Sequence, residues 1–268
     1  MNSQDELKAE NLLLKLKLEM EHGMMMSDMS KLGPEIENQW LSNIYNFESQ
    51  FESAKQIKVY DLIGRPDFKP LHELTIQEIS EELSRLLNIL WENQINFSCI
   101  CEYDDELIYR FITEEFFEHE VDDIQVDGMI NHFVYEVFHP NHDYDLRRYA
   151  TEFIEKILKG SWIPEFDRSD FTSEVTFRSK QYDGDSISGI IQTFQEAFHP
   201  VEIKESSIEH VGFDLEEQFA SVRIQLSYST RPENGKAPVY TGMAFLNFKM
   251  EFDYWRICSF QLPGFGGE

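Results

Sequence analysis

The sequence predicts an α+β protein in two parts, a helix-rich α+β module with a small sheet over residues 1–160 and a strand-rich domain over residues 161–268. In the first part apolar residues recur every three or four positions, which is the period of an amphipathic helix. In the second part they recur at every second position of long segments, which is the period of a strand. The junction is expected at residues 161–170, where Pro164 interrupts the chain and neither period is evident.

Two helices are expected at the start of the chain. Residues 4–22 place Leu7, Leu14 and Leu18 on one stripe, which predicts a helix that packs on its own domain or, alternatively, docks on a partner chain. A second helix begins at Pro34, because proline suits the first helical turn. Its regularly spaced apolar residues predict a buried face made of Ile36, Trp40, Ile44, Phe47 and Phe51.

Shorter elements follow in the first part. Residues 58–64 predict a short strand. Thr75 and Glu78 have the spacing of a capping box, so a helix is expected over residues 76–94. The next expected elements are a strand over residues 95–101 and a helix over residues 104–120.

Residues 130–146 are the place where histidines and carboxylates crowd together. On a helix, His132, Glu136 and His139 would share one stripe with His142 close behind, and zinc or iron could be held. On a strand, the Cα atoms of His132 and Glu136 would lie roughly 13 Å apart, too far for one ion to bridge. The helical alternative supports a metal-dependent hydrolase.

The residue types favour the strand. Residues 132–138 are a dense run of aromatic and β-branched side chains, and Pro140 disfavours a helical residue before it. We then expect a turn in which Asn141 or Asp143 caps a helix over residues 143–160. This interpretation accounts for the histidines without a metal ion, and no cofactor is expected.

Strands dominate the second part. The expected elements are a strand over 173–182, a helix over 185–198, two strands within 206–230, a turn over 231–238, and strands over 239–252 and 254–265. Long apolar strands need a helix on their concave face, and the segment over residues 186–198 has the required apolar spacing. The expected architecture is therefore a curved antiparallel sheet packed on a helix.

This order of elements, ending in the aromatic-rich "YWRICSFQLPGF", resembles the cone-shaped NTF2-like (SnoaL-like, cystatin-like) superfamily. The resemblance implies a pocket between helix and sheet, in which enzymes of the superfamily place Asp, His or Tyr, and it implies a homodimer. Candidate pocket residues are His210, Asp214, Tyr228 and Tyr240, although the residue types favour a structural interpretation, a capped tyrosine hydroxyl or a surface histidine. Upstream, "EEFFEHEVDDI…HFVYEVFHPNHDYD" resembles an uncharacterised family of bacterial cytoplasmic proteins, which brings no activity with it.

Composition narrows the partners and the compartment. Fifty Asp and Glu against 23 Lys and Arg give a net charge of −27, which repels nucleic acid and anionic membrane surfaces. Residues 1–23 are charged throughout and do not predict a signal peptide, and no stretch approaches the roughly 20 apolar residues of a membrane span. The odd set Cys99, Cys101 and Cys258 suits a reducing compartment, so a cytoplasmic protein is expected.

The sequence holds no phosphate-binding glycine loop, nucleophile elbow or paired C-x-x-C motif. We therefore expect a binding protein that holds a small apolar ligand or a protein partner in the C-terminal cone, rather than an enzyme. The alternatives are the metal-dependent hydrolase above and a cofactor-free isomerase or hydrolase that uses His210 and a tyrosine in the cone.

Overall fold

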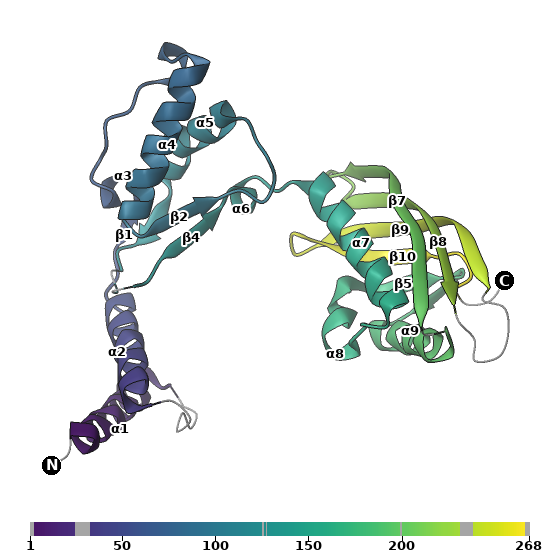
Figure 1. Ribbon diagram of the computed structural model, residues 1–268, viewed down its shortest axis with the longest axis horizontal. Coiled ribbons are helices and arrows are strands. Elements are labelled where there is room, and N and C mark those ends of the chain that lie inside the picture. The colour runs from purple at the N-terminus through teal and green to yellow at the C-terminus, as the bar shows by residue number, and fades with distance from the viewer. Residues whose placement is uncertain are drawn as a thin grey trace. The chain divides into compact units, whose positions relative to one another are not determined.

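The computed structural model describes residues 3–24, 33–124, 126, 128–198, 200–230 and 238–265, so the turn expected over 231–238 falls almost wholly outside it. The chain forms two compact units, unit 1 over Met1–His139 and unit 2 over Pro140–Glu268 (Figure 1). This division precedes the junction expected at residues 160 and 161. The reason is helix α7 (His142–Lys159), whose apolar face belongs to the core of unit 2.

Unit 1 begins with a helical hairpin of α1 (Ser3–His22) and α2 (Pro34–Phe51). The first helix packs through its expected stripe, and Leu18 and Leu41 are fully buried. The amide of Asn11 donates to the carbonyl oxygen of Pro34 at 2.9 Å. Polar and apolar contacts thus join the two helices to each other.

The expected buried face of α2 is wrong for three of its five residues, whereas Ile44 and Phe47 are half-buried. Ile36, Trp40 and Phe51 are 60%, 43% and 54% exposed, whereas Leu41, on another side of the helix, is buried. The physical reason is that α1 covers a different face of α2, and the residues packed in the core of unit 1 all come from later in the chain. Amphipathic spacing identifies the apolar face of a helix, but it does not identify which element packs on that face.

The rest of unit 1 consists of short elements. They are β1 (Gln56–Lys58), α3 (Val59–Leu62), η1 (Leu71–Glu73), α4 (Ile76–Glu92), β2 (Ile95–Ser98), α5 (Asp105–Glu114), η2 (Phe116–Glu118), β3 (Glu120–Asp122), β4 (Asn131–Val134) and α6 (Tyr135–Phe138). Strands β1 and β3 pair antiparallel, and β2 and β4 pair in parallel. The strand expected over 58–64 is mostly the short helix α3. The capping box of Thr75 and Glu78 at the start of α4 is confirmed.

The histidine-containing stretch is part strand and part helix. Residues 131–134 form β4 beside β2, and α6 adds a single helical turn. The strand prediction is therefore confirmed only for the first half. Pro140 follows, and the side chain of Asn141 caps α7 by accepting from the backbone N–H of Tyr144 at 3.1 Å, as expected.

Aromatic side chains form the core of unit 1. Phe111 lies at the centre, with its ring centroid between 5.0 and 5.9 Å from those of Phe97, Phe116, Tyr135 and Phe138. Offset and edge-to-face ring pairs at such distances stabilise a core beyond the area they bury. Helices α4 and α5 complete it with buried leucine and isoleucine.

Unit 2 is built on one six-stranded sheet. After α7 come α8 (Pro164–Asp167), η3 (Arg168–Asp170), β5 (Phe171–Phe177), β6 (Lys180–Tyr182), α9 (Gly184–Phe198), β7 (Val201–Asp214), β8 (Phe219–Thr230), β9 (Val239–Glu251) and β10 (Tyr254–Gln261). The strand order is β6-β5-β10-β9-β8-β7. All neighbours pair antiparallel except β5 and β10, which are parallel. The strand expected over 173–182 is a hairpin of β5 and β6.

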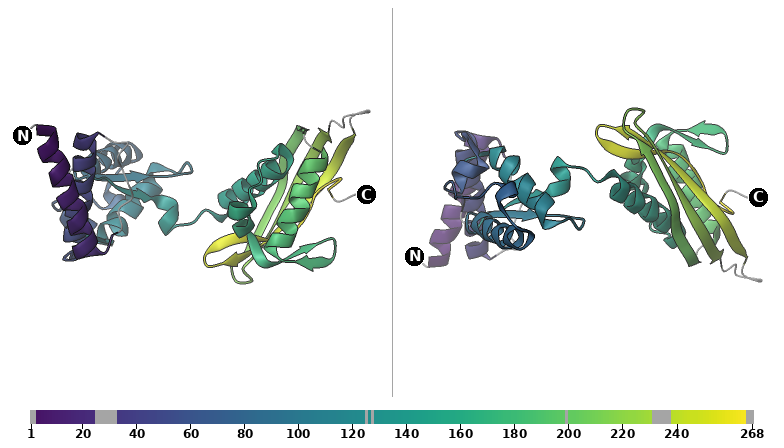
Figure 2. Two further views of the ribbon diagram at one scale, coloured as in Figure 1. Left: turned by 90° about the horizontal axis from the view of Figure 1, so that it is seen from below. Right: turned by 90° about the horizontal axis from the view of Figure 1, so that it is seen from above.

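Helices α7 and α9 cover one face of this sheet (Figure 2). Alternate residues of β8 and β9, such as Val222, Ile224, Leu246 and Phe248, are buried against them. The α+β fold with a curved sheet packed on helices is therefore confirmed. Strand β7 forms one edge, and its register with β8 shifts between Ile203 and Glu205 and between Ile208 and His210.

Candidate functional site

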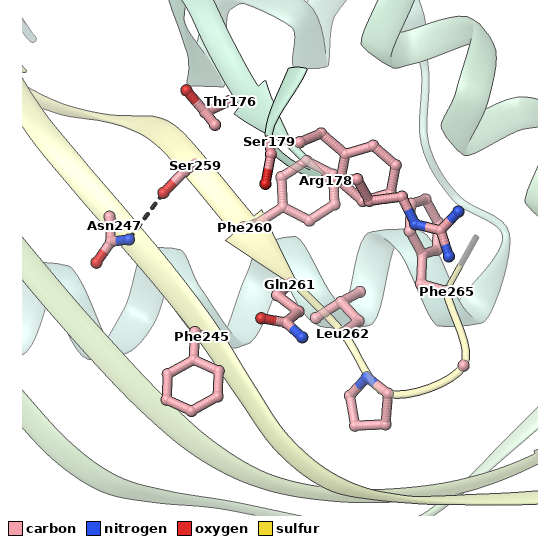
Figure 3. Close-up of a pocket in the computed structure, with 13 residues that line it drawn as sticks. Thr176, Arg178, Ser179, Phe245, Asn247, Ser259, Phe260, Gln261, Leu262 and Phe265 are labelled. Atoms are coloured by element: carbon pink, nitrogen blue, oxygen red, sulfur yellow. Dashed lines mark hydrogen bonds between the residues drawn. The ribbon is translucent and has the colours of Figure 1, made fainter. Parts of the chain in front are cut away.

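A cleft of about 750 Å³ in unit 2 lies on the face of the sheet that the helices leave open (Figure 3). Phe245 and Asn247 of β9 line it, and they alternate with Leu246 and Phe248, which are buried on the helix side. The β5–β6 turn and the segment after β10 form its walls. The lining residues are Thr176, Phe177, Arg178, Ser179, Phe245, Asn247, Ser259, Phe260, Gln261, Leu262, Pro263, Gly264 and Phe265.

The turn between β5 and β6 carries the charged group of the cleft. Arg178 and Ser179 have φ values of 52° and 61°, the left-handed conformation that a tight two-residue hairpin turn requires at both central positions. Glycine or asparagine usually occupies such positions, so the turn accepts a conformational cost to place these side chains here. The guanidinium of Arg178 lies 5.8 Å from the ring centroid of Phe177.

Hydroxyl and amide groups line the floor. The amide nitrogen of Asn247 donates to the hydroxyl oxygen of Ser259 at 2.7 Å, which links β9 to β10 across the cleft (Figure 3). Thr176 and Gln261 add a hydroxyl and an amide from β5 and β10. These groups donate and accept hydrogen bonds without changing charge near neutral pH.

The segment after β10 is fixed against the core. Buried Tyr228 donates its hydroxyl to the carbonyl oxygen of Pro263 at 2.5 Å. Gly264 has φ +70° and crosses the ring of Tyr240 so closely that an added Cβ would lie 2.1 Å from a ring carbon. Only glycine fits there, and it brings the ring of Phe265 to 5.4 Å from that of Phe177. The apolar wall is therefore held in place by the fold.

A second, smaller cleft of about 250 Å³ lies between α7 and β10. Lys156 reaches from α7 to Asp167 at 2.8 Å and to Asp170 at 2.9 Å. Burial raises the pKa of Asp170 although Lys156 acts in the opposite direction. The bridge thus offsets only part of the cost of burying this carboxylate, and its evident role is to join α7 to the start of the sheet.

The four pocket residues expected from the NTF2-like resemblance lie in different surroundings. Tyr228 is buried in the core, which raises the pKa of its hydroxyl, and its ring is 5.2 Å from that of Tyr240. His210 is exposed on β7 opposite Arg223. Asp214 caps the β7–β8 turn by accepting from the backbone N–H groups of Glu216 and Glu217. The four are not among the residues that line the cleft.

The four candidate metal ligands also have separate partners. His132 bonds to Asn96 at 3.0 Å, His139 bonds to Glu115 at 2.8 Å, and the indole nitrogen of Trp255 donates to His142 at 3.2 Å. Glu136 accepts from the backbone N–H groups of Ile100 and Cys101 at 2.8–3.0 Å. Within the part of the chain that the structure describes, no three His, Cys, Asp or Glu side chains form a group that could hold a metal ion.

Cys99 of unit 1 is a poor nucleophile at neutral pH. Burial, together with the nearby Glu136 carboxylate, raises the pKa of its thiol to about 11. Because the thiolate is the reactive form, Cys99 stays protonated and unreactive.

Sequence reasoning missed the residues of the cleft. Arg178 and Ser179 were placed inside a continuous strand, because neither residue is typical of a hairpin turn. One available signal was the alternation in β9, which puts Phe245 and Asn247 on the face opposite the apolar core. The approach of the segment around Pro263 to Tyr228 depends on tertiary structure and has no local signal.

No protein family model matches the sequence, and no curated protein matches it. A candidate scytalone dehydratase from Novosphingobium aromaticivorans is 15% identical over 44% of this chain and 80% of its own, with a TM-score of 0.37. A candidate dehydratase of the NTF2-like family from Streptomyces avermitilis is 15% identical over 45% and 94%, with a TM-score of 0.35. A Kribbella flavida protein is 14% identical over 46% and 91%, with a TM-score of 0.37.

The first of these structures carries the name of a scytalone dehydratase and the second that of the NTF2-like family, and each of the three matches less than half of this chain. Sequence identities and TM-scores this low do not indicate a function. The architecture of unit 2 is established by its own strand order and packing. The resemblance of the N-terminal part to a bacterial family finds no support. Among the described residues, the helices are too short or too polar to cross a membrane.

Proposed function

We propose that unit 2 is a non-enzymatic binding module whose open-face cleft holds a small ligand with a flat apolar body and one anionic group. The observation that carries this proposal is that Arg178 and the exposed ring of Phe245 line one cleft of about 750 Å³. A guanidinium forms strong, directional hydrogen bonds to a carboxylate or phosphate. The ring of Phe245, which is 40% exposed, suits a planar apolar group.

The chemistry of the lining favours binding over catalysis. Hydroxyl, amide and guanidinium groups orient a ligand, whereas general acid–base catalysis needs a group that gains and loses a proton near the working pH. The lining residues carry no carboxylate, imidazole or thiol. A hydrolase or isomerase would have to bring such a group from elsewhere.

The packing of the cone directs the ligand to the open face. The space between the sheet and helices α7 and α9 is occupied by buried apolar side chains. Tyr228, which a cone enzyme would present to substrate, instead bonds to Pro263 within the core. The open-face cleft has both room and polar groups, which are the features of small-molecule sites.

The proposal is tested with 2-naphthoate and its uncharged counterpart 2-naphthamide, which share one planar body. Affinities are measured by ligand-observed NMR on the full chain. Wild type should bind the naphthoate about tenfold more tightly, the effect of one charge-assisted hydrogen bond. Arg178→Gln should remove this preference and leave naphthamide binding unchanged.

A matched control is Arg147→Gln, which removes a guanidinium from the exposed surface of α7, where it pairs with Asp143. It should bind both probes as wild type does. Equal affinities of wild type for the two probes, or a preference that survives Arg178→Gln, would show that the cleft is not an anion-selective site.

A further inference from the structure

A row of side chains continues the open-face cleft across the sheet of unit 2. Gln261 of β10 lies opposite Phe245 of β9. Phe245 is in turn opposite Arg223 of β8, and Arg223 is opposite His210 of β7. Directly opposite residues of an antiparallel pair point to the same face, so all four share the face of the cleft. Gln261 and Phe245 line the cleft, whereas Arg223 and His210 extend the row beyond it.

Arg178 is level with the other end of this row. Ser259 of β10 is in register with Thr176 of the parallel strand β5. Arg178 follows Thr176 by two residues and Gln261 follows Ser259 by two, so Arg178 is level with Gln261. Figure 3 shows Gln261 between Arg178 and Phe245. The row therefore begins and ends with a cationic or polar nitrogen group.

Arg223 is exposed and forms no ion pair with the residues that the structure describes. The chain has 50 Asp and Glu against 23 Lys and Arg, so a surface cation has many carboxylates to pair with. Arg147 and Arg148 of α7, for example, each bind a carboxylate four residues away. Beside Arg223, the carboxylate of Glu209 instead accepts from the hydroxyl of Ser207 at 3.1 Å. The Arg223 guanidinium is therefore available to an anion that a ligand supplies.

His210 adds a hydrogen-bonding group beside Arg223. Its ring extends over Gly212, where an added Cβ would lie 2.9 Å from Nε2 of the imidazole. A larger residue at position 212 would therefore displace the ring. Because an imidazole N–H donates hydrogen bonds, His210 and Arg223 together offer donors from two neighbouring strands.

Arg178 and Arg223 lie on opposite sides of the exposed ring of Phe245. The strand order β5-β10-β9-β8 places the turn that carries Arg178 on one side of β9 and Arg223 on the other. Neighbouring strands are about 4.8 Å apart, so β5 and β8 are separated by roughly 14 Å. Two long arginine side chains shorten this gap to the length of a small planar molecule. A flat ligand on Phe245 then has a guanidinium at each end.

We propose that the ligand of this site is a planar aromatic dicarboxylate, with one carboxylate bound by Arg178 and the other by Arg223 with His210 beside it. This inference rests on the proposed function and extends it from one anionic group to two. The net charge of −27 repels anions from the chain as a whole. A dianion is therefore held only where guanidinium groups stand in place for both of its charges.

The test compares 2,6-naphthalenedicarboxylate with 2-naphthoate, which has the same planar body and one carboxylate. Affinities are measured by ligand-observed NMR on the full chain. Wild type should bind the dicarboxylate about tenfold more tightly, the effect of a second charge-assisted hydrogen bond. Arg223→Gln should abolish this gain. It should leave the affinity for 2-naphthoate unchanged, because the single carboxylate of that probe pairs with Arg178 inside the cleft.

Lys249→Gln is the matched control, because Lys249 is an exposed cation of the same face, opposite Phe219 and four residues from Phe245 along β9. It lies roughly 13 Å from Phe245, beyond the screening length of about 8 Å at physiological salt. This variant should keep the full gain. Calorimetry should show the transition of unit 2 unchanged in both variants, since both side chains are exposed.

The outcomes separate this inference from the proposed function. A wild-type gain of no more than about twofold, which two equivalent carboxylates give by statistics alone, would overturn the inference. So would a gain that survives Arg223→Gln or that is lost equally in Lys249→Gln, because the attraction would then be general. In these cases the proposed function still stands if 2-naphthoate binds through Arg178. A wild type that does not bind 2-naphthoate would overturn both.

Discussion

The two units of this protein reach stability by different means. Unit 2 has one six-stranded sheet and one core, so neighbouring strands pair their backbone groups across the whole sheet. Unit 1 has two sheets of two short strands each, and its longer connections depend on side chains such as Glu136 and Tyr109 that bond to backbone groups. In both units, side chains pair backbone groups that helices and strands leave over, as Glu136 does in unit 1 and Tyr228 in unit 2, so the units differ in how their sheets are built.

The largest effect is expected in the core of unit 2. Phe248 is fully buried in β9 beneath the helices. Phe248→Ala should lower the free energy of unfolding of unit 2 by about 3–5 kcal/mol, the loss typical of a buried phenylalanine. Calorimetry on the full chain should show the transition of unit 2 at a lower temperature and that of unit 1 unchanged.

The equivalent change in unit 1 is Phe116→Ala, since Phe116 is also fully buried. This variant should lower the unfolding temperature of unit 1 and leave that of unit 2 unchanged. A shift of both transitions by either variant would mean that the units unfold together, which would contradict their separation.

A smaller loss of stability is expected when a side-chain hydrogen bond of unit 1 is weakened. Glu136→Gln should destabilise unit 1 by about 1–3 kcal/mol, because its carboxylate accepts backbone N–H groups of Ile100 and Cys101. Glu118→Gln is the control. That carboxylate pairs with Lys58 on the surface, where such pairs contribute little, and unit 1 should be unaffected.

The Glu136 carboxylate should also make the stability of unit 1 depend on pH. Burial alone would raise the pKa of Glu136, but the backbone hydrogen bonds from Ile100 and Cys101 outweigh it, and the pKa is lowered from its ordinary 4.5. Because the pKa of Glu136 is lower in the folded state, its ionised carboxylate stabilises the fold above about pH 4.5. This contribution is lost as the pH falls further. Urea unfolding from pH 6 to 3 should show this loss in wild type and a weaker one in Glu136→Gln.

The smallest effect is expected at the bridge of unit 2. Lys156→Met should destabilise unit 2 by about 1 kcal/mol, since the pair with Asp167 and Asp170 is partly exposed and only partly offsets the burial of Asp170. The measurement is urea unfolding at neutral pH. A loss as large as that of Phe248→Ala would show that ionic contacts rival the core.

Local signals predicted the features that depend on neighbours in the sequence. The capping box of Thr75, the cap by Asn141 and the first-turn Pro34 are all found. Each is fixed by backbone groups within four residues, so the sequence alone determines it.

The rest depended on contacts between distant residues. The boundary between the units was placed too late because helix α7 has the same period whichever core it joins. The face of α2 was assigned to the interior because spacing does not reveal whether another element reaches it. The cleft combines Arg178 with Asn247 and Ser259 across three strands, and its geometry follows from strand order rather than from any one segment.

Strand β7 has a consequence for behaviour in concentrated solution. It is the longest strand and lies at the edge of the sheet, where unpaired backbone groups invite another chain to add a strand. Its two register shifts interrupt the regular ladder, and Glu202, Lys204 and Glu205 put charge along it. These features make the edge a poor template for fibril growth, so unit 2 can expose a long strand and still resist aggregation.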